Sequence, residues 1–288
     1  MGIENFSRQQ NEGIENAKEA FRLVHVSTDA FLKQIPPVPE GKPLQEVGTP
    51  PDKEVGPDEV SRILKVTLHW SEEVWADVFS QLGKKYKEPT MVLYNDSTES
   101  TSRWGHRKSL DARNGPVALP DENRIYFDPD SLGRFFRNFW GGPQTPVIAY
   151  SLFHETAHIV QKQLGYFRKL QRERNKIFRE PDPSRHLVAL ELQADFLAGH
   201  ALRKANERHQ IMNEGDTERV YWAAAAVGDD FCQLRRGNLV NPQRFSHGSA
   251  KERALAFWQG VSSGDLRYGL DYSEFLKRSD ALLSRTTK

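Results

Sequence analysis

The sequence contains AYSLFHETAHIVQKQLG at residues 149–165, and its predicted fold and chemistry both depend on this segment. Two histidines stand four residues apart in it, at His154 and His158. An α-helix completes a turn about every 3.6 residues, so both imidazoles lie on one face, where one metal ion can bind both. Glu155 is placed to take a proton from an attacking water. The segment therefore predicts a metal-dependent hydrolytic centre on one helix.

The helix around this motif has a clear beginning and end. Thr145 is suited to cap its N-terminus, Pro146 to occupy its first position, and Gly165 to end it. Apolar residues surround the motif: Val147, Ile148, Tyr150, Leu152, Phe153, Ala157, Ile159, Val160 and Leu164. Such a helix is expected to be central and mostly buried. A buried His-Glu-His set favours a bound metal, because polar groups without partners are costly there. The alternative is a core helix with two hydrogen-bonded histidines.

A second helix is predicted from Ser184 through LVALELQADFLAGHALRKA, with a core face of Leu187, Leu190, Ala194 and Leu197. Glu191 and Asp195 stand four residues apart on one face of it. Two histidines and a glutamate are a common ligand set of catalytic zinc, which makes Glu191 the expected third ligand. Asp195 is then expected to accept the outer N–H of a ligand histidine. The alternative is an exposed acidic pair.

Another histidine of interest is His247, in Phe245-Ser246-His247-Gly248-Ser249. Ser249 and Glu252 form a predicted capping box for a helix over 250–259, so His247 lies just before a helix N-terminus. From there it can donate a hydrogen bond to the oxyanion of a tetrahedral intermediate. A structural loop histidine is the alternative interpretation. His200 is expected to face away from Glu191, and His186 to lie on the surface.

Composition limits the classes of function. The chain has 288 residues and a net charge of +1, which implies no general attraction to nucleic acid or membranes. One cysteine excludes a disulfide within the chain. No apolar stretch is long enough to cross a bilayer, and the N-terminus lacks the pattern of a secretory signal. These features predict a cytoplasmic protein.

Three regions follow one another along the chain. Residues 1–35 are polar and then helical in pattern, suited to a contact with a partner or with a second copy. Residues 36–58 are rich in proline and predict an extended linker, which is also long enough to occupy the cleft of a latent enzyme. Residues 59–288 form the predicted catalytic domain.

The remaining pattern predicts an α+β fold that is mostly helical. Strands are expected at 90–94 and 124–127, with a long surface excursion at 95–123 between them. Further helices are expected from Ser71 to Gly83, at 130–138 and at 217–227. The basic segment 168–180 predicts a solvated helix or loop rather than a nucleic-acid arm. Asp229 and Asp230 allow three interpretations: a helix-end turn, a ligand-orienting group or a cation site.

Five motifs in this order resemble the bacterial neutral zinc metallopeptidase family, a gluzincin-like group: GPVALPDENRIYFD at 115–128, AYSLFHETAHIVQKQLG at 149–165, ELQADFLAG at 191–199, VGDD at 227–230 and FSHGSAKERALAFWQG at 245–260. The resemblance covers roughly residues 60–275. It implies a zincin-like fold, with a small sheet beside the active-site helix. It implies His154, His158 and Glu191 as zinc ligands, and Glu155 as general base. It also supports Asp195 as the residue that accepts the outer N–H of a ligand histidine.

The sequence departs from this family at two points. Family members are usually tethered by an N-terminal membrane helix, where this chain has a polar segment. Relatives also carry cysteines at places that here hold Trp104, Leu119 and Leu270. Both departures favour a cytoplasmic setting.

The resulting hypothesis is a zinc peptidase that acts on a protein or peptide substrate. Glu155 takes a proton from the attacking water, and His247, or alternatively Tyr126, steadies the oxyanion. A competing hypothesis is a metal-binding interaction or regulatory protein with little turnover. The intact Glu155 argues against it, because a protein without turnover needs no base at this position.

Overall fold

The computed structural model describes residues 57–101, 107–140, 145–168, 184–263 and 265–271, together with residues 273, 275 and 277. The helical segment predicted at 1–35 lies outside these ranges. Residues 36–56 of the linker predicted at 36–58 also lie outside them. Residues 169–180 of the basic segment predicted at 168–180 lie outside the described ranges as well. The described residues form two compact units, one within 57–168 and 197–220, the other within 184–196 and 221–277.

The first unit begins with the long helix α2, Pro57–Gln81. The predicted helix start at Ser71 is wrong, because this serine lies in the middle of α2, where it is fully buried and shares a hydrogen bond of 2.9 Å with Thr156. Its position before two glutamates imitates a capping signal. The helix continues upstream because buried residues recur there at helical spacing: Val60, Ile63, Leu64 and Thr67.

A three-stranded sheet lies in the same unit, in the order β1-β5-β4. Strands β1 (Thr90–Leu93) and β5 (Arg124–Phe127) pair in parallel, and β4 (Val117–Leu119) pairs antiparallel to β5. The predicted strands at 90–94 and 124–127 are thereby confirmed. The central strand β5 buries three consecutive side chains, Ile125, Tyr126 and Phe127. It gives the unit a rigid layer of apolar surface.

The predicted surface excursion at 95–123 is wrong in part, because three strands form within it. Strands β2 (Ser97–Thr101) and β3 (Arg107–Asp111) make an antiparallel hairpin, followed by the short helix η1 (Ala112–Asn114) and by β4. The side chains of β2 and β3 are mostly polar, so their hydrophobic pattern carries no strand signal. The hairpin is held instead by backbone pairing and by a small core that includes Tyr94, Leu110 and Tyr126.

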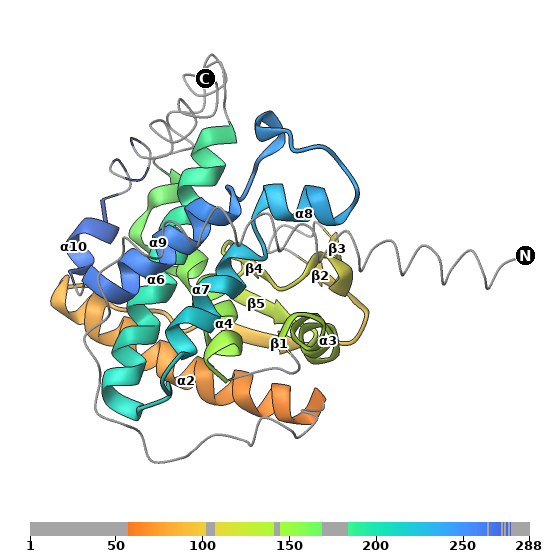
Figure 1. Cartoon of the computed structure of the whole chain (residues 1–288). Helices are drawn as coiled ribbons and strands as arrows, with labels where there is room; N and C mark the ends of the chain where they lie inside the picture. The colour runs from red at the N-terminus through yellow and green to blue at the C-terminus, as the bar shows by residue number, and fades with distance from the viewer. Residues whose placement is uncertain are drawn as a thin grey trace, which may run out of the picture. The chain divides into compact units, whose positions relative to one another are not determined.

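Two helices follow the strands in the first unit, α3 (Pro129–Trp140) and α4 (Thr145–Leu164). Both agree with the helices predicted from the sequence. The helix α4 ends before Gly165, whose φ of 87° is a conformation that favours glycine. It packs along α2 and against β4 and β5 (Figure 1). At its C-terminal end, Gln163 exchanges two hydrogen bonds with the backbone of Lys87, at 2.7 and 2.9 Å. Packing on several sides fixes α4 firmly.

The helix α6, Ser184–His209, begins at the predicted residue. Its C-terminal part belongs to the first unit, where Arg208 bonds to Asp77 and His209 contacts Glu73. Near its start two side-chain predictions are wrong: Leu187 is 54 % exposed, and His186 is only 5 % exposed. Ala194, seven residues after Leu187 and on nearly the same side of the helix, is fully buried as predicted, so the errors are confined to the first turn of α6.

The second unit contains the start of α6, the second half of α7 (Asp216–Ala225), and three further helices. These are α8 (Asp229–Arg235), α9 (Ala250–Ser263) and the short α10 (Leu266–Gly269), with η2 (Pro242–Arg244) between α8 and α9. The predicted capping box is confirmed: Ser249 N–H donates to Glu252 Oε2 at 2.7 Å, and Glu252 N–H donates to Ser249 Oγ at 3.3 Å. These bonds fix the start of α9.

The described chain is thus predominantly helical with a small sheet, which is the predicted α+β class. None of the described helices combines the length and the apolar character needed to cross a membrane.

Candidate metal centre

The centre is built on the buried middle of α4. His154 is 7 % exposed and Glu155 is 9 % exposed, while His158 is half-buried. The rings of the two histidines meet edge to face, with centroids 4.9 Å apart and an interplanar angle of 90°. The spacing of four residues has therefore brought both imidazoles to one face, as the sequence predicts.

A residue that the sequence analysis missed orients His158. Its Nδ1 lies 2.9 Å from Oε1 of Gln161, which is fully buried on the same helix. A neutral imidazole that donates Nδ1–H to this amide oxygen presents the lone pair of Nε2, the atom that a metal would bind. Gln161 stands three residues after His158, so the helical period alone could have suggested this contact.

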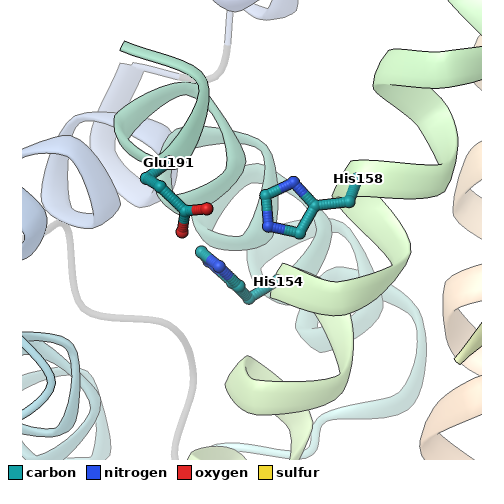
Figure 2. A group of neighbouring side chains, drawn as sticks. All are labelled: His154, His158 and Glu191. Carbon is teal, nitrogen blue, oxygen red and sulfur yellow. The ribbon is translucent and has the colours of Figure 1, made fainter. Parts of the chain in front are cut away.

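Glu191, on α6, completes a group of three. One ligand atom from each of His154, His158 and Glu191 lies within 4.8 Å of the other two. Figure 2 shows the two imidazoles and the carboxylate pointing toward one another. Two nitrogens and one carboxylate oxygen form a donor set typical of catalytic zinc, and their separation allows one ion to contact all three after small side-chain rotations. Within the described part of the chain, no other group of this kind is found.

Asp195, predicted to support a ligand histidine, is fully buried and paired with Arg253. The guanidinium donates to both carboxylate oxygens, from Nε at 2.8 Å and from Nη2 at 2.9 Å, and its Nη1 donates to the carbonyl of Val227 at 3.3 Å. The alternative of an exposed acidic pair is wrong for Asp195. A carboxylate accepts more than two hydrogen bonds, so the predicted bond to a histidine remains compatible with this pair and stays a prediction.

Arg253 is the second residue that the sequence analysis missed. It lies on α9, 58 positions from its partner, and no local pattern connects the two. A fully buried aspartate on a helix implies a cationic partner somewhere in the chain, but 40 lysines and arginines compete for that role in the sequence.

His247 lies in the turn before α9, and Asp229 organises that turn. Oδ2 of Asp229 accepts the backbone N–H of Ser246 at 2.7 Å, of His247 at 2.6 Å and of Gly248 at 3.1 Å. Its Oδ1 lies 3.2 Å from Nδ1 of the His247 ring. The His247 side chain is 52 % exposed, so the ring is held at one edge and open to solvent at the other.

The hydrogen bond with Asp229 raises the pKa of His247 above its usual value, while burial opposes the rise. The charge of Glu191 adds to the rise and that of Arg253 opposes it. The neighbouring acid, Asp230, accepts the N–H of Ala250 at 2.7 Å. Of the three interpretations for this acidic pair, the bond to Ala250 favours the helix-end turn for Asp230, while the contacts of Asp229 join it to the turn that carries His247.

The other candidates are also placed. Tyr126, on β5, is 2 % exposed, and its hydroxyl donates to Oε2 of Glu122 at 3.3 Å. His200 is 3 % exposed on α6. Neither His186 nor His200 belongs to the metal-binding group.

Comparison with known sequences decides the family. Residues 41–269 match the model of a family described as "Putative neutral zinc metallopeptidase". The chain belongs to this family. The resemblance seen in the motifs is therefore confirmed, and zinc is the metal that this neutral zinc metallopeptidase family suggests for the His154, His158 and Glu191 group.

The curated proteins that match this chain include several named as uncharacterized. The uncharacterized protein YpfJ of Escherichia coli is 29 % identical over 228 residues, which cover 78 % of this chain and 76 % of YpfJ. Uncharacterized proteins of Mycobacterium tuberculosis and Mycobacterium bovis are each 32 % identical over 160 residues, which cover 52 % of this chain and 53 % of theirs. No solved structure matches significantly. The predicted cytoplasmic setting stays a prediction.

Proposed function

We propose that this chain is a zinc-dependent peptidase with a zincin-like fold. The observation that carries the proposal is the convergence of His154, His158 and Glu191 from two helices, with Glu155 directly beside the first histidine. Membership of the zinc metallopeptidase family supports the same function. The small sheet packed against α4 is the arrangement expected of a zincin-like fold.

His154, His158 and Glu191 would hold the ion. When bound, zinc supplies a Lewis acid that polarises the scissile carbonyl and acidifies the attacking water. Gln161 fixes the orientation of the His158 ring, so one of the three ligands is already oriented.

Glu155 serves as the general base. It is 9 % exposed on a rigid helix, so its carboxylate is held in a setting with little solvent. It takes a proton from the attacking water and passes it to the departing amine of the substrate. His247 donates a hydrogen bond to the oxyanion that forms on the carbonyl. Tyr126 is the weaker candidate for this role, because Glu122 already engages its hydroxyl.

The test replaces the carboxylate of Glu155 with an uncharged amide. Glu155→Gln keeps the size and the helix but removes proton acceptance, so we expect hydrolysis of an unfolded protein substrate to fall by about 10²- to 10⁴-fold. Zinc content, measured by elemental analysis, should stay at the wild-type level. The matched control is Glu207→Gln, a half-exposed glutamate near the end of α6. An unchanged rate in Glu155→Gln would overturn this mechanism. A wild type that binds zinc but cleaves nothing would favour the interaction protein.

A further inference from the structure

We infer that Asp229 is a positioning residue, which holds the imidazole of His247 in the orientation needed to meet the oxyanion. The inference rests on the proposed function, in which His247 contacts the substrate. It concerns an acid for which the sequence left several roles open, and it follows from contacts within one compact unit.

One carboxylate fixes both the backbone and the ring of this turn. Oδ2 of Asp229 gathers the N–H groups of three consecutive residues, Ser246 to Gly248, at 2.6 to 3.1 Å. Oδ1 faces Nδ1 of His247 at 3.2 Å. Ser246 Oγ lies 2.9 Å from the same nitrogen. The ring therefore has two polar partners on its Nδ1 side, and its rotation is restricted.

The turn also packs against α6, the helix that carries Glu191. A Cβ atom on Gly248 would lie 3.3 Å from side-chain atoms of Leu192 and Val188, the neighbours of Glu191 on α6. On the other side, a Cβ atom on Gly228 would lie 2.2 Å from the backbone nitrogen of Ala250. Such close contacts leave the turn little room to shift. The turn that carries His247 thus lies against the segment of α6 that carries the proposed ligand Glu191.

The bond from Nδ1–H to Asp229 has a consequence for the other ring nitrogen. An imidazole that donates from Nδ1 can also donate from Nε2 only when it is doubly protonated. The negative charge of Asp229 favours that form. Asp229 therefore directs the ring that is proposed to donate to the oxyanion, and its charge favours the form that donates from both nitrogens.

The sequence offers a matched pair of variants in adjacent residues. In Asp229→Asn the amide oxygen can replace Oδ2 and keep the three backbone bonds, while the NH₂ group cannot accept from the ring. In Asp230→Asn the same charge is removed one residue away, and the remaining oxygen still accepts the N–H groups of Phe231 and Ala250. Both variants are expected to fold. Any difference between them therefore reports the contact with the ring.

The first readout is independent of activity. In the zinc-loaded full-length protein, the Nδ1 proton of His247 should give a strongly deshielded, slowly exchanging NMR signal, assigned by its loss in His247→Gln. We expect the signal in wild type and in Asp230→Asn, and its loss in Asp229→Asn. A signal that survives unchanged in Asp229→Asn would overturn the inference, whether or not the protein proves to be a peptidase.

The second readout is kinetic, on the same unfolded protein substrate. Removing one oxyanion donor costs about 10²- to 10³-fold in kcat, and a misdirected donor is expected to lose part of this. We therefore expect kcat of Asp229→Asn to fall about 10- to 100-fold. KM should change little, and Asp230→Asn should resemble wild type. Equal kcat in the two variants would overturn the inference. An inactive wild type would overturn the proposed function, and the NMR signal alone would then decide the position of the ring.

Discussion

The two parts of the candidate site are built in opposite ways. His154, Glu155 and His158 lie within five residues of one helix, and the helical period alone brings the two imidazoles together. His247 lies in a turn, where its backbone and ring are held by a carboxylate 18 positions away. The first part needs α4 to form. The second part needs two distant segments, 228–230 and 246–253, to meet correctly.

This difference predicts how each part responds to change. A substitution in the helical part removes a chemical group and leaves the backbone in place, because α4 is packed on several sides. A substitution in the turn changes the position of groups that it does not itself carry. Substitutions in the turn should therefore lower the activity in part, whereas substitutions of the catalytic or ligand residues of α4 should remove most of it.

The largest effect is expected from the loss of a metal ligand. Glu191→Ala should lower zinc affinity and abolish hydrolysis, because two histidines alone form an incomplete site. Stripping the wild type with a chelator should have the same effect, and adding zinc should restore the wild type but not the variant. Elemental analysis and calorimetry measure the binding. Glu214→Ala, at an exposed position before α7, is the control. A fully zinc-loaded Glu191→Ala protein would contradict the assignment of the third ligand.

A smaller but substantial effect is expected at Arg253. Arg253→Met leaves the buried carboxylate of Asp195 without its partner, which typically costs about 3–5 kcal/mol in the free energy of unfolding. Urea denaturation measures it. The double variant Asp195→Asn with Arg253→Met should recover much of the loss, since no buried charge is then left unpaired. If Arg253→Met alone is as stable as wild type, the pair does not hold α9 in place.

The sequence predicted the helical part of the site well and the turn poorly, for a physical reason. Period and capping chemistry are local, so α4, the start of α6 and the Ser249–Glu252 box could be recognised without the structure. Contacts between distant segments leave no local signal. The pairing of Asp195 with Arg253 was missed for this reason.

Some errors arose where a local pattern was ambiguous. Ser71 has the neighbours of a helix cap but lies inside α2, because the buried face of that helix extends back to Val60, about three turns before the cap signal. The strands β2 and β3 were assigned to a surface excursion, because their polar side chains hide a pairing made by the backbone. In both cases tertiary packing decided between two structures that the local sequence allows.

The smallest effect is expected where the turn joins α9. Ser249→Ala removes the side-chain oxygen that accepts the N–H of Glu252, and loss of such a cap costs about 1 kcal/mol. The backbone N–H of Ser249 still donates to the carboxylate of Glu252, so the helix start should loosen rather than unfold. Urea denaturation measures the cost, and Ser262→Ala, at the other end of α9, is the control. If the turn positions His247, as its contacts indicate, Ser249→Ala should also lower kcat modestly while zinc content stays constant. A loss of stability without any change in kcat would mean that the anchor at Asp229 is sufficient by itself to hold the ring.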